Sequence, residues 1–207
     1  MPKIVDHAQR RRDIVTATWR VIARGGLANA TTREIAKEAG YSNGVLAHYF
    51  TDRADILASA LVMAHRGVRD RTDIRIQGLR GLSALRLLMI ESLPLDEQGL
   101  LEAKIEACFW GEAVGNKAMM KIQNEEVDGF CARVRALLVQ ATEDGELEDG
   151  VDIDRIVHEC LILMDGLSIQ AVMYPARADA IEQVALLDAL IDRIRAKRRR
   201  RPHSQSA

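Results

Sequence analysis

A short polar run holds the side chains of this sequence with the clearest recognition chemistry. Ser42, Asn43 and Gly44 follow one another, and Val45 and Leu46 come next. An asparagine amide both donates and accepts hydrogen bonds, which matches the edge of an adenine, while Val45 or Leu46 could contact a thymine methyl group. Gly44 has no side chain, so a helix that carries it can lie close to its partner. These residue types predict the reading of base edges, provided that a helix presents them.

Two short helices joined by a tight turn would present this run. The stretch 31–50, TTREIAKEAGYSNGVLAHYF, begins with Thr31 and Glu34 at the spacing of a capping box, in which the threonine accepts an early backbone N–H and the glutamate reaches back. Gly40 ends the first helix, and Ser42 is a good N-cap for the second. Each helix has about two turns and is too short to be stable alone. A helix-turn-helix explains the pair, because its second helix lies in the DNA major groove.

Basic and polar residues around this motif are further candidates for DNA contact. Thr32 and Arg33 start the first helix of the pair, whose N-terminal amides favour a phosphate. Arg10, Arg11 and Arg12 lie at the exposed start of a helix that we predict over 7–24 and that Gly25 and Gly26 would end. From there the arginines could reach phosphates or a neighbouring minor groove. A charge run that only keeps the surface solvated is the alternative.

The same stretch resembles a known protein family. The run TTREIAKEAGYSNGVLAHYF, followed by a charged DR and an apolar helix, is similar to the N-terminal domain of the tetracycline-repressor family of bacterial transcription regulators. Within this family, the run SNGVLAHYF is most similar to the choline-responsive repressors of betaine synthesis. The resemblance is specific over residues 8–62 and covers only architecture beyond them. It implies that His48 and Tyr49 contact phosphate or bases, that Phe50 is buried, and that Arg53 serves the phosphate held by a lysine in many members.

The composition is that of a globular protein whose charge is unevenly distributed. The 207 residues are 48% hydrophobic and 29% charged, with a net charge of −1. Residues 1–90 contain 15 Lys/Arg and 8 Asp/Glu, residues 91–192 contain 7 and 22, and residues 193–201 contain seven basic residues and no acid. The predicted motif therefore lies in the basic part, as a phosphate-binding module should.

Several classes of protein are disfavoured by what the sequence lacks. No run approaches 18 uncharged apolar residues, so we expect neither a membrane span nor a secretion signal. Cys108, Cys131 and Cys160 form no disulfide framework, which fits a reducing cytoplasm. The sequence has no CxxC or HxxxH pair, no P-loop, no GxSxG and no GxGxxG, and the acidic turn at 144–155 fails the register of a calcium loop. We therefore expect no metal, no cofactor and no enzymatic activity.

Apolar periodicity predicts an all-α fold of about nine helices. Beyond the motif we expect helices over about 53–76, 82–93, 96–115, 116–143, 154–174 and 178–197. The predicted domains are a DNA-binding domain over 1–52, a ligand-binding and dimerisation domain over 53–197, and a basic and polar tail over 198–207. The tail either adds non-specific DNA affinity or is a frayed helix end.

The last two predicted helices carry long apolar stripes that suggest a dimer. The stripe residues are Ile156, Cys160, Leu163 and Leu167 on the first helix and Val184, Leu187 and Ile191 on the second. Too little chain remains to cover both stripes, and a partner's copy would complete a four-helix bundle. Such a homodimer would place two recognition helices about one DNA turn, roughly 34–36 Å, apart on a palindromic operator. The alternative is an intramolecular core.

A ligand pocket is expected among large apolar residues of the C-terminal domain. The candidates are Met89, Phe109, Trp110, Met119, Met120, Phe130 and Met164, with Glu102, Glu106 and Gln123 as polar partners. Aromatic faces beside a carboxylate would suit a quaternary ammonium ion. The same residues could equally form ordinary core.

These patterns together predict a homodimeric, cytoplasmic transcription regulator that acts as a repressor. Its expected partners are operator DNA, a second copy of the chain and an unknown small-molecule effector. The effector would favour a state in which helix 53–76 moves the recognition helices out of register with the operator. The alternatives are a constitutive DNA-binding dimer without an effector, and an all-α enzyme or partner-binding bundle whose first domain is vestigial.

Overall fold

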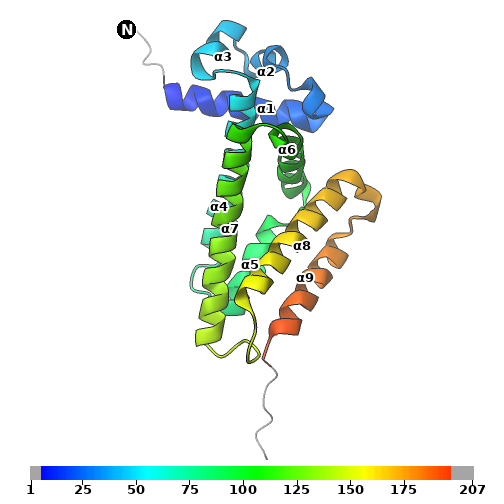
Figure 1. Ribbon diagram of the computed structural model, residues 1–207. Helices are drawn as coiled ribbons and strands as arrows, with labels where there is room; N and C mark the ends of the chain where they lie inside the picture. Colours follow the sequence, from blue (N-terminus) through cyan, green and yellow to red (C-terminus); the bar gives the residue numbers. More distant parts are fainter. Residues whose placement is uncertain (1–5, 197–207) are drawn as a thin grey trace, which may run out of the picture.

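The computed structural model describes residues 6–196, which form an all-α protein (Figure 1). This part of the chain contains nine α-helices and one short 3₁₀ helix. Their bounds are α1 (His7–Asn29), α2 (Thr32–Ala39), α3 (Asn43–Tyr49), α4 (Arg53–Arg75), α5 (Gly81–Ser92), α6 (Glu97–Ala113), α7 (Lys117–Glu143), α8 (Ile153–Met173), η1 (Pro175–Arg177) and α9 (Ala180–Ile194). The predicted fold class is confirmed. The predicted tail over 198–207 lies outside the described residues.

Two long helices connect the ends of the molecule. Figure 1 shows α1, α2 and α3 gathered at one end, with α4 and α7 running from there along the length of the protein. Helix α6 lies directly below the first three helices and packs on both α1 and α4. Helices α5, α8 and α9 form the opposite end. Helices α4 and α6 therefore belong to both halves.

Local capping sets the helices of the N-terminal end. The Thr31 hydroxyl accepts a hydrogen bond from the backbone N of Glu34 at 3.2 Å, and Ser42 accepts one from Val45 at 3.3 Å. Gly40 adopts the left-handed conformation with φ of 73°, as predicted. The capping box is only half formed, because the Thr31 N–H donates to the Asn29 carbonyl instead of to Glu34. The turn between α2 and α3 is thereby fixed by local residues.

The predicted end of the first helix at Gly25 and Gly26 is a kink rather than a stop. Gly26 has φ of 69° and ψ of −176°, which interrupts the helical path. One further turn follows the kink and ends at Asn29. After the kink, the carbonyls of Leu27 and Ala30 face Arg53, which donates a hydrogen bond to each.

The first of two cores joins the N-terminal helices to α4 and α6. It contains Ile14 of α1, Ile35 of α2, Leu46 of α3, Leu61 of α4 and Phe109 of α6, all buried. The predicted domain boundary at residue 52 falls just before α4, yet the first half of that helix packs in this core. The N-terminal helices are consequently not free to move independently of α4 and α6.

The second core corrects the predicted dimer stripes. Ile156, Cys160, Leu167, Leu187 and Ile191 are buried within the chain, where they pack with α5 and α7. Leu163 and Val184 are half-buried. The intramolecular alternative is therefore right for most of these residues, since α5 and α7 supply enough apolar surface to cover them.

A different apolar surface on the last two helices is left exposed. Its large side chains are Ile162, Met173, Tyr174, Ile181 and Leu186. Ile162, Gly166, Ile169 and Met173 repeat every three or four residues and so share one face of α8. We call this surface, with Ile181 and Leu186 of α9, the α8–α9 seam.

Helix α8 is also the one helix within residues 6–196 that is long and apolar enough to cross a membrane by length and composition. Its most apolar window has a mean hydropathy of 1.5, although the sequence analysis expected no membrane span. Six of its residues are nevertheless buried, five of them in the second core, and core helices of globular proteins pass the same test. Its apolar character is explained by burial on one face and by the α8–α9 seam on another.

We predict that Phe109→Ala destabilises the protein by about 3–5 kcal/mol, because a fully buried aromatic side chain leaves a cavity in the first core. Thermal unfolding of the two proteins measures the difference. Val114→Ala, at the exposed end of the same helix, is the control and should change stability by less than about 0.5 kcal/mol. An unfolding temperature of Phe109→Ala equal to that of the parent would contradict the packing described here.

Candidate nucleic-acid interface and effector cavity

The recognition candidates on α3 divide into an exposed and a buried set. Ser42, Asn43, Gly44 and His48 are exposed, while Tyr49 is half-buried. Leu46 is 2% exposed and lies in the first core, so the predicted contact of Leu46 with a thymine methyl group is wrong. The spacing explains the error: Leu46 occupies the one face of α3 that must pack on α1 and α4. Half-exposed Val45 keeps the alternative thymine contact.

The arginines at the start of α1 differ in the contacts that they make. The Arg11 guanidinium donates to the Tyr49 carbonyl at 2.7 Å and to the Ser59 hydroxyl at 2.8 Å, pairs with Asp55 at 3.2 Å, and lies over the Phe50 ring. It therefore braces α1 against α3 and α4. Its predicted phosphate contact stays a prediction, and it would require the guanidinium to leave these partners.

The neighbouring arginines are more available. Arg12 is exposed and bonds only to the side chain of Gln9, one turn earlier on the same helix. Arg10 lies over the ring of Tyr41 at 5.8 Å. Thr32 and Arg33 are both exposed at the start of α2. These four residues can approach a phosphate backbone without losing an ion pair within residues 6–196.

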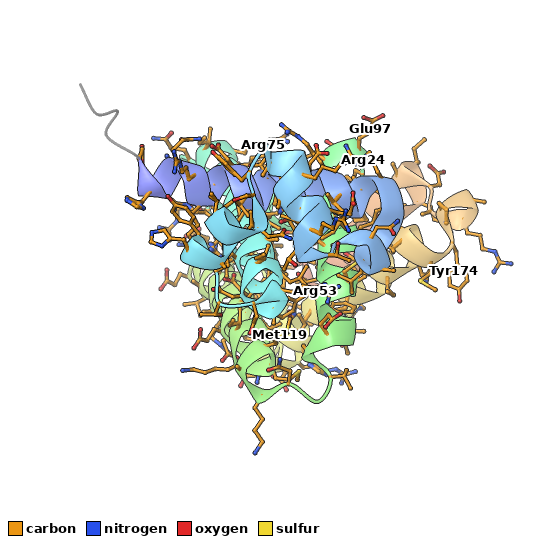
Figure 2. All side chains as sticks on the ribbon, turned by 90° about the horizontal axis from the view of Figure 1, so that it is seen from above. Arg24, Arg53, Arg75, Glu97, Met119 and Tyr174 are labelled. Atoms are coloured by element: carbon orange, nitrogen blue, oxygen red, sulfur yellow. The ribbon has the colours of Figure 1, made fainter. Side chains whose placement is uncertain are left out.

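Arg53 connects the two halves of the molecule. Its guanidinium donates to the Ala30 carbonyl at 2.9 Å, to the Leu27 carbonyl at 3.1 Å and to the Glu112 carboxylate of α6 at 2.8 Å. Figure 2, seen from above, labels Arg53 near the centre of the projection. The prediction that it serves a phosphate is not supported by this geometry, because its donors are directed into the chain.

A cavity of about 140 Å³ lies below the first core, between α4, α5, α6, α7 and α8. Glu106, Trp110, Phe130 and Met164 line it, as does Glu102. The other predicted ligand residues lie elsewhere. Phe109 and Met119 are in the first core, Met89 is in the second, Met120 is exposed on the outer surface of α7, and Gln123 stands behind Glu106.

Charged side chains of this cavity are mostly paired. Arg71 binds both oxygens of Glu102, at 2.9 and 2.7 Å, and Arg69 pairs with Glu126. His65 Nε2 lies 2.6 Å from Glu106. The sequence analysis gave no role to His65, Arg69 or Arg71 of α4. A signal was present, since His65, Arg69 and Thr72 form a polar stripe on α4 and Glu102 and Glu106 form an acidic one on α6.

Glu106 interacts with three side chains at the cavity. Its carboxylate accepts hydrogen bonds from Trp110 at 2.9 Å and Gln123 at 2.6 Å in addition to His65. Burial alone would raise the pKa of Glu106, but the His65 imidazole and the two other donors lower it. Burial alone would lower the pKa of His65, but Glu106 and then Glu126 raise it. Both shifts favour an imidazolium beside a carboxylate.

Asp165 differs from the other carboxylates that line the cavity. Within residues 6–196 no hydrogen bond or ion pair reaches it, and it stands at the rim on α8. Partial burial of the Asp165 carboxyl, and then the negative charge of Glu106, raise the pKa of Asp165 to about 6. The cavity thus combines two aromatic rings, Trp110 and Phe130, with one carboxylate that lacks a cation.

Metal and thiol chemistry find no support in the described part of the chain. No group of three or more His, Cys, Asp or Glu residues there could hold a metal ion. Burial raises the pKa of Cys108, Cys131 and Cys160, the last to about 12, so none is a ready thiolate.

We predict that the stabilising effect of His65 is lost with rising pH. A raised folded-state pKa means that its contribution is full below about pH 6.5, the ordinary imidazole value, and disappears as pH passes the folded-state value. The unfolding temperatures of the parent and of His65→Gln should therefore differ more at pH 6 than at pH 8.5. Glu106→Gln should remove most of this pH dependence. A constant gap between the parent and His65→Gln would contradict the ion pair.

Comparison with known proteins identifies the family. Residues 14–60 match the model of bacterial regulatory proteins of the tetR family, and residues 82–196 match that of the C-terminal domain of BetI-type transcriptional repressors. The transcriptional regulator PksA of Bacillus subtilis is 34% identical over 189 residues, which are 90% of this chain and 91% of that protein. The transcriptional regulator BetI of Serratia proteamaculans is 27% identical over 198 residues, 90% and 92% of the two chains.

A solved structure has the same fold. A putative transcriptional regulator from Saccharomonospora viridis, in complex with choline, superposes with a TM-score of 0.84 at 24% identity, over 92% of this chain and all of the other. The resemblance seen in residues 31–50 is thereby confirmed. The chain belongs to the tetR family of bacterial regulatory proteins, as a transcription regulator with a BetI-type C-terminal domain and not as an enzyme.

Proposed function

We propose that this regulator is a homodimeric, cytoplasmic repressor that leaves its operator when a cationic effector enters the cavity. The exposed face of α3 is the observation that carries the DNA-binding part. Ser42, Asn43 and Gly44 are free of the first core, and Arg33 and Arg12 flank them as phosphate contacts. Asn43 would read an adenine, and the arginines would fix the register on the duplex.

The α8–α9 seam supports the homodimer. Exposed Ile162 and Met173, with half-buried Ile169 between them, form apolar surface that a monomer rarely leaves open to water. Gly166 lies in the middle of that row and would allow close approach of the partner's helix. Two-fold pairing of α8 and α9 makes a four-helix bundle and places the two α3 helices on successive turns of one DNA face.

Cavity chemistry supports a cationic effector. Asp165 offers an unpaired carboxylate, and Trp110 and Phe130 offer aromatic faces, which together attract a quaternary ammonium group. The choline bound to the regulator of the same fold agrees with this class of ligand. A bound cation would also lower the pKa of Asp165 and so hold it in the ionised form.

Helix α6 provides a path from the cavity to the DNA-binding end. It carries Glu106 and Trp110 at the cavity and, one to two turns later, Glu112 at Arg53. An effector that shifts α6 changes the position of Glu112, and Arg53 conveys this to the end of α1. Such a shift requires that the effector bind the DNA-free state more tightly than the DNA-bound one.

A constitutive dimer without an effector is the second candidate. The pairing of Glu102, Glu106 and Glu126 within the chain favours it, because these carboxylates need no ligand. A melting temperature that stays unchanged in the presence of millimolar choline or tetramethylammonium would support this candidate and contradict the cationic effector.

We predict that Asn43→Ala weakens binding to the operator by about 1–3 kcal/mol, roughly 5- to 150-fold, and leaves binding to random-sequence DNA unchanged. Fluorescence anisotropy with the DNA that flanks the gene of this protein measures both. Arg33→Ala is the matched comparison: it should weaken both complexes and reduce the slope of log K against log salt by about 0.9. Equal losses on both duplexes for Asn43→Ala would rule out base reading by this residue.

We predict that Asp165→Asn raises the choline concentration needed for half-release from the operator at least tenfold, because the ligand charge loses its partner. Asp70→Asn, an exposed change on α4, should leave that concentration unchanged. If both variants respond to choline as the parent does, the cation is not held at Asp165.

A further inference from the structure

Ion pairs within residues 6–196 account for nearly all of the charged side chains that line the cavity. Asp165 is the exception, since no hydrogen bond or ion pair of these residues reaches it. An effector therefore meets a lining whose other charges are already balanced. The pairs are His65 with Glu106, Arg69 with Glu126, Arg71 with Glu102, and Arg133 with Asp73.

The hydroxyl groups of the lining also divide into occupied and available ones. Thr72 Oγ1 donates to the Val68 carbonyl at 2.7 Å, and Ser92 Oγ donates to the Leu88 carbonyl at 2.9 Å. Each of these hydroxyls is thus bound to the carbonyl four residues earlier on its own helix. Ser168 makes no such bond, and in the part of the chain that the structure describes no hydrogen bond reaches its side chain. Ser168 is therefore available to a ligand.

The available carboxylate and the available hydroxyl lie on one face of α8. Positions 165 and 168 are three residues apart, so their side chains are neighbours on the helix surface, separated along its axis by about 4.5 Å. Both line the cavity, and Ser168 is half-buried. Neither residue was a candidate in the sequence analysis, because their availability depends on how side chains of other helices are paired.

The rest of the lining offers a ligand mostly apolar surface. Trp110 Nε1 donates to Glu106 at 2.9 Å, which occupies the only hydrogen-bonding group of the indole and leaves its ring to the cavity. Phe130, Leu161 and Met164 complete this surface. The cavity of about 140 Å³ therefore presents one unpaired negative charge, one neutral hydrogen-bonding group a turn away, and apolar walls.

We propose that Ser168 selects among cations, and that the effector is a compact quaternary ammonium ion with a hydroxyl group on a short chain. The ammonium charge lies at Asp165 and the ligand hydroxyl at Ser168. This inference rests on the proposed cationic effector and specifies its chemistry. A serine hydroxyl both donates and accepts, so it can pair with a ligand hydroxyl in either orientation.

The two contacts do different things for the ligand. Asp165 attracts any cation of suitable size and does not distinguish one quaternary ammonium ion from another. An ion without the hydroxyl would displace water from Ser168 and leave that side chain without a partner, which lowers its affinity. A ligand carboxylate at the same place would be repelled by Asp165 one turn away. The arrangement therefore favours a neutral hydrogen-bonding group.

The test is isothermal titration calorimetry of the full-length protein with choline and with propyltrimethylammonium. The two ions have the same charge and nearly the same shape, and differ by a hydroxyl in place of a methyl group. The parent should bind choline roughly three- to tenfold more tightly, as one net hydrogen bond predicts. Ser168→Ala should bind choline more weakly by about this factor and bind propyltrimethylammonium as the parent does.

Ser92→Ala is the matched control, because it removes a lining hydroxyl that is already bound to its own helix. It should keep the parent's preference for choline. The coupling between the ligand hydroxyl and the side chain at position 168 is obtained from the cycle of two proteins and two ligands.

The outcomes separate this inference from the proposed function. A parent that binds neither ion at millimolar concentration would overturn the cationic effector itself. A parent that binds both ions equally would leave the cationic effector in place and overturn only the selection by Ser168. A preference for choline that is as large in Ser168→Ala as in the parent would also overturn it, since the hydroxyl would then be recognised elsewhere.

Discussion

Arg53 makes the contact on which the two-part architecture depends. Three donors of one guanidinium satisfy two carbonyls at the end of α1 and the carboxylate of Glu112 on α6. The kink at Gly26 brings the carbonyls into place, and Asp52 starts α4 so that Arg53 is its first residue. Because α6 also supplies Glu106 and Trp110 to the cavity, the DNA-binding end and the cavity share one rigid element. A planar, permanently charged guanidinium suits such a junction better than a lysine would.

The cavity illustrates how a chain holds many charges below its surface. Each of three carboxylates is placed opposite a basic side chain of α4, which keeps the cost of burial low. Asp165 alone breaks that pattern within the described cavity lining, and it does so beside two aromatic rings. The contrast between paired and unpaired acids, rather than the number of acids, is the observation behind the proposed cationic effector.

Local signals in the sequence predicted most of the fold. The Ser42 side chain caps its own segment and Gly40 acts through its own backbone conformation, so their roles could be read without knowing the tertiary structure. Leu46, Phe109 and the stripe at Ile156 were assigned wrongly for one shared reason: periodicity identifies an apolar face but not the surface that covers it. The partners of His65 lie on helices distant in sequence, and no single stretch encodes them.

Helix α8 contributes residues to three different parts of the molecule. Met164 and Leu167 serve the second core, Asp165 and Ser168 serve the cavity, and Ile162 and Met173 belong to the α8–α9 seam. Neighbouring positions of α8 are thus constrained by the second core, by the cavity and by the α8–α9 seam. Under the proposed subunit pairing, a substitution in α8 that changes the effector must also preserve the dimer contact. Under the proposed pairing through α8 and α9, substitutions in α4 and α7 could change ligand preference without altering the subunit contact.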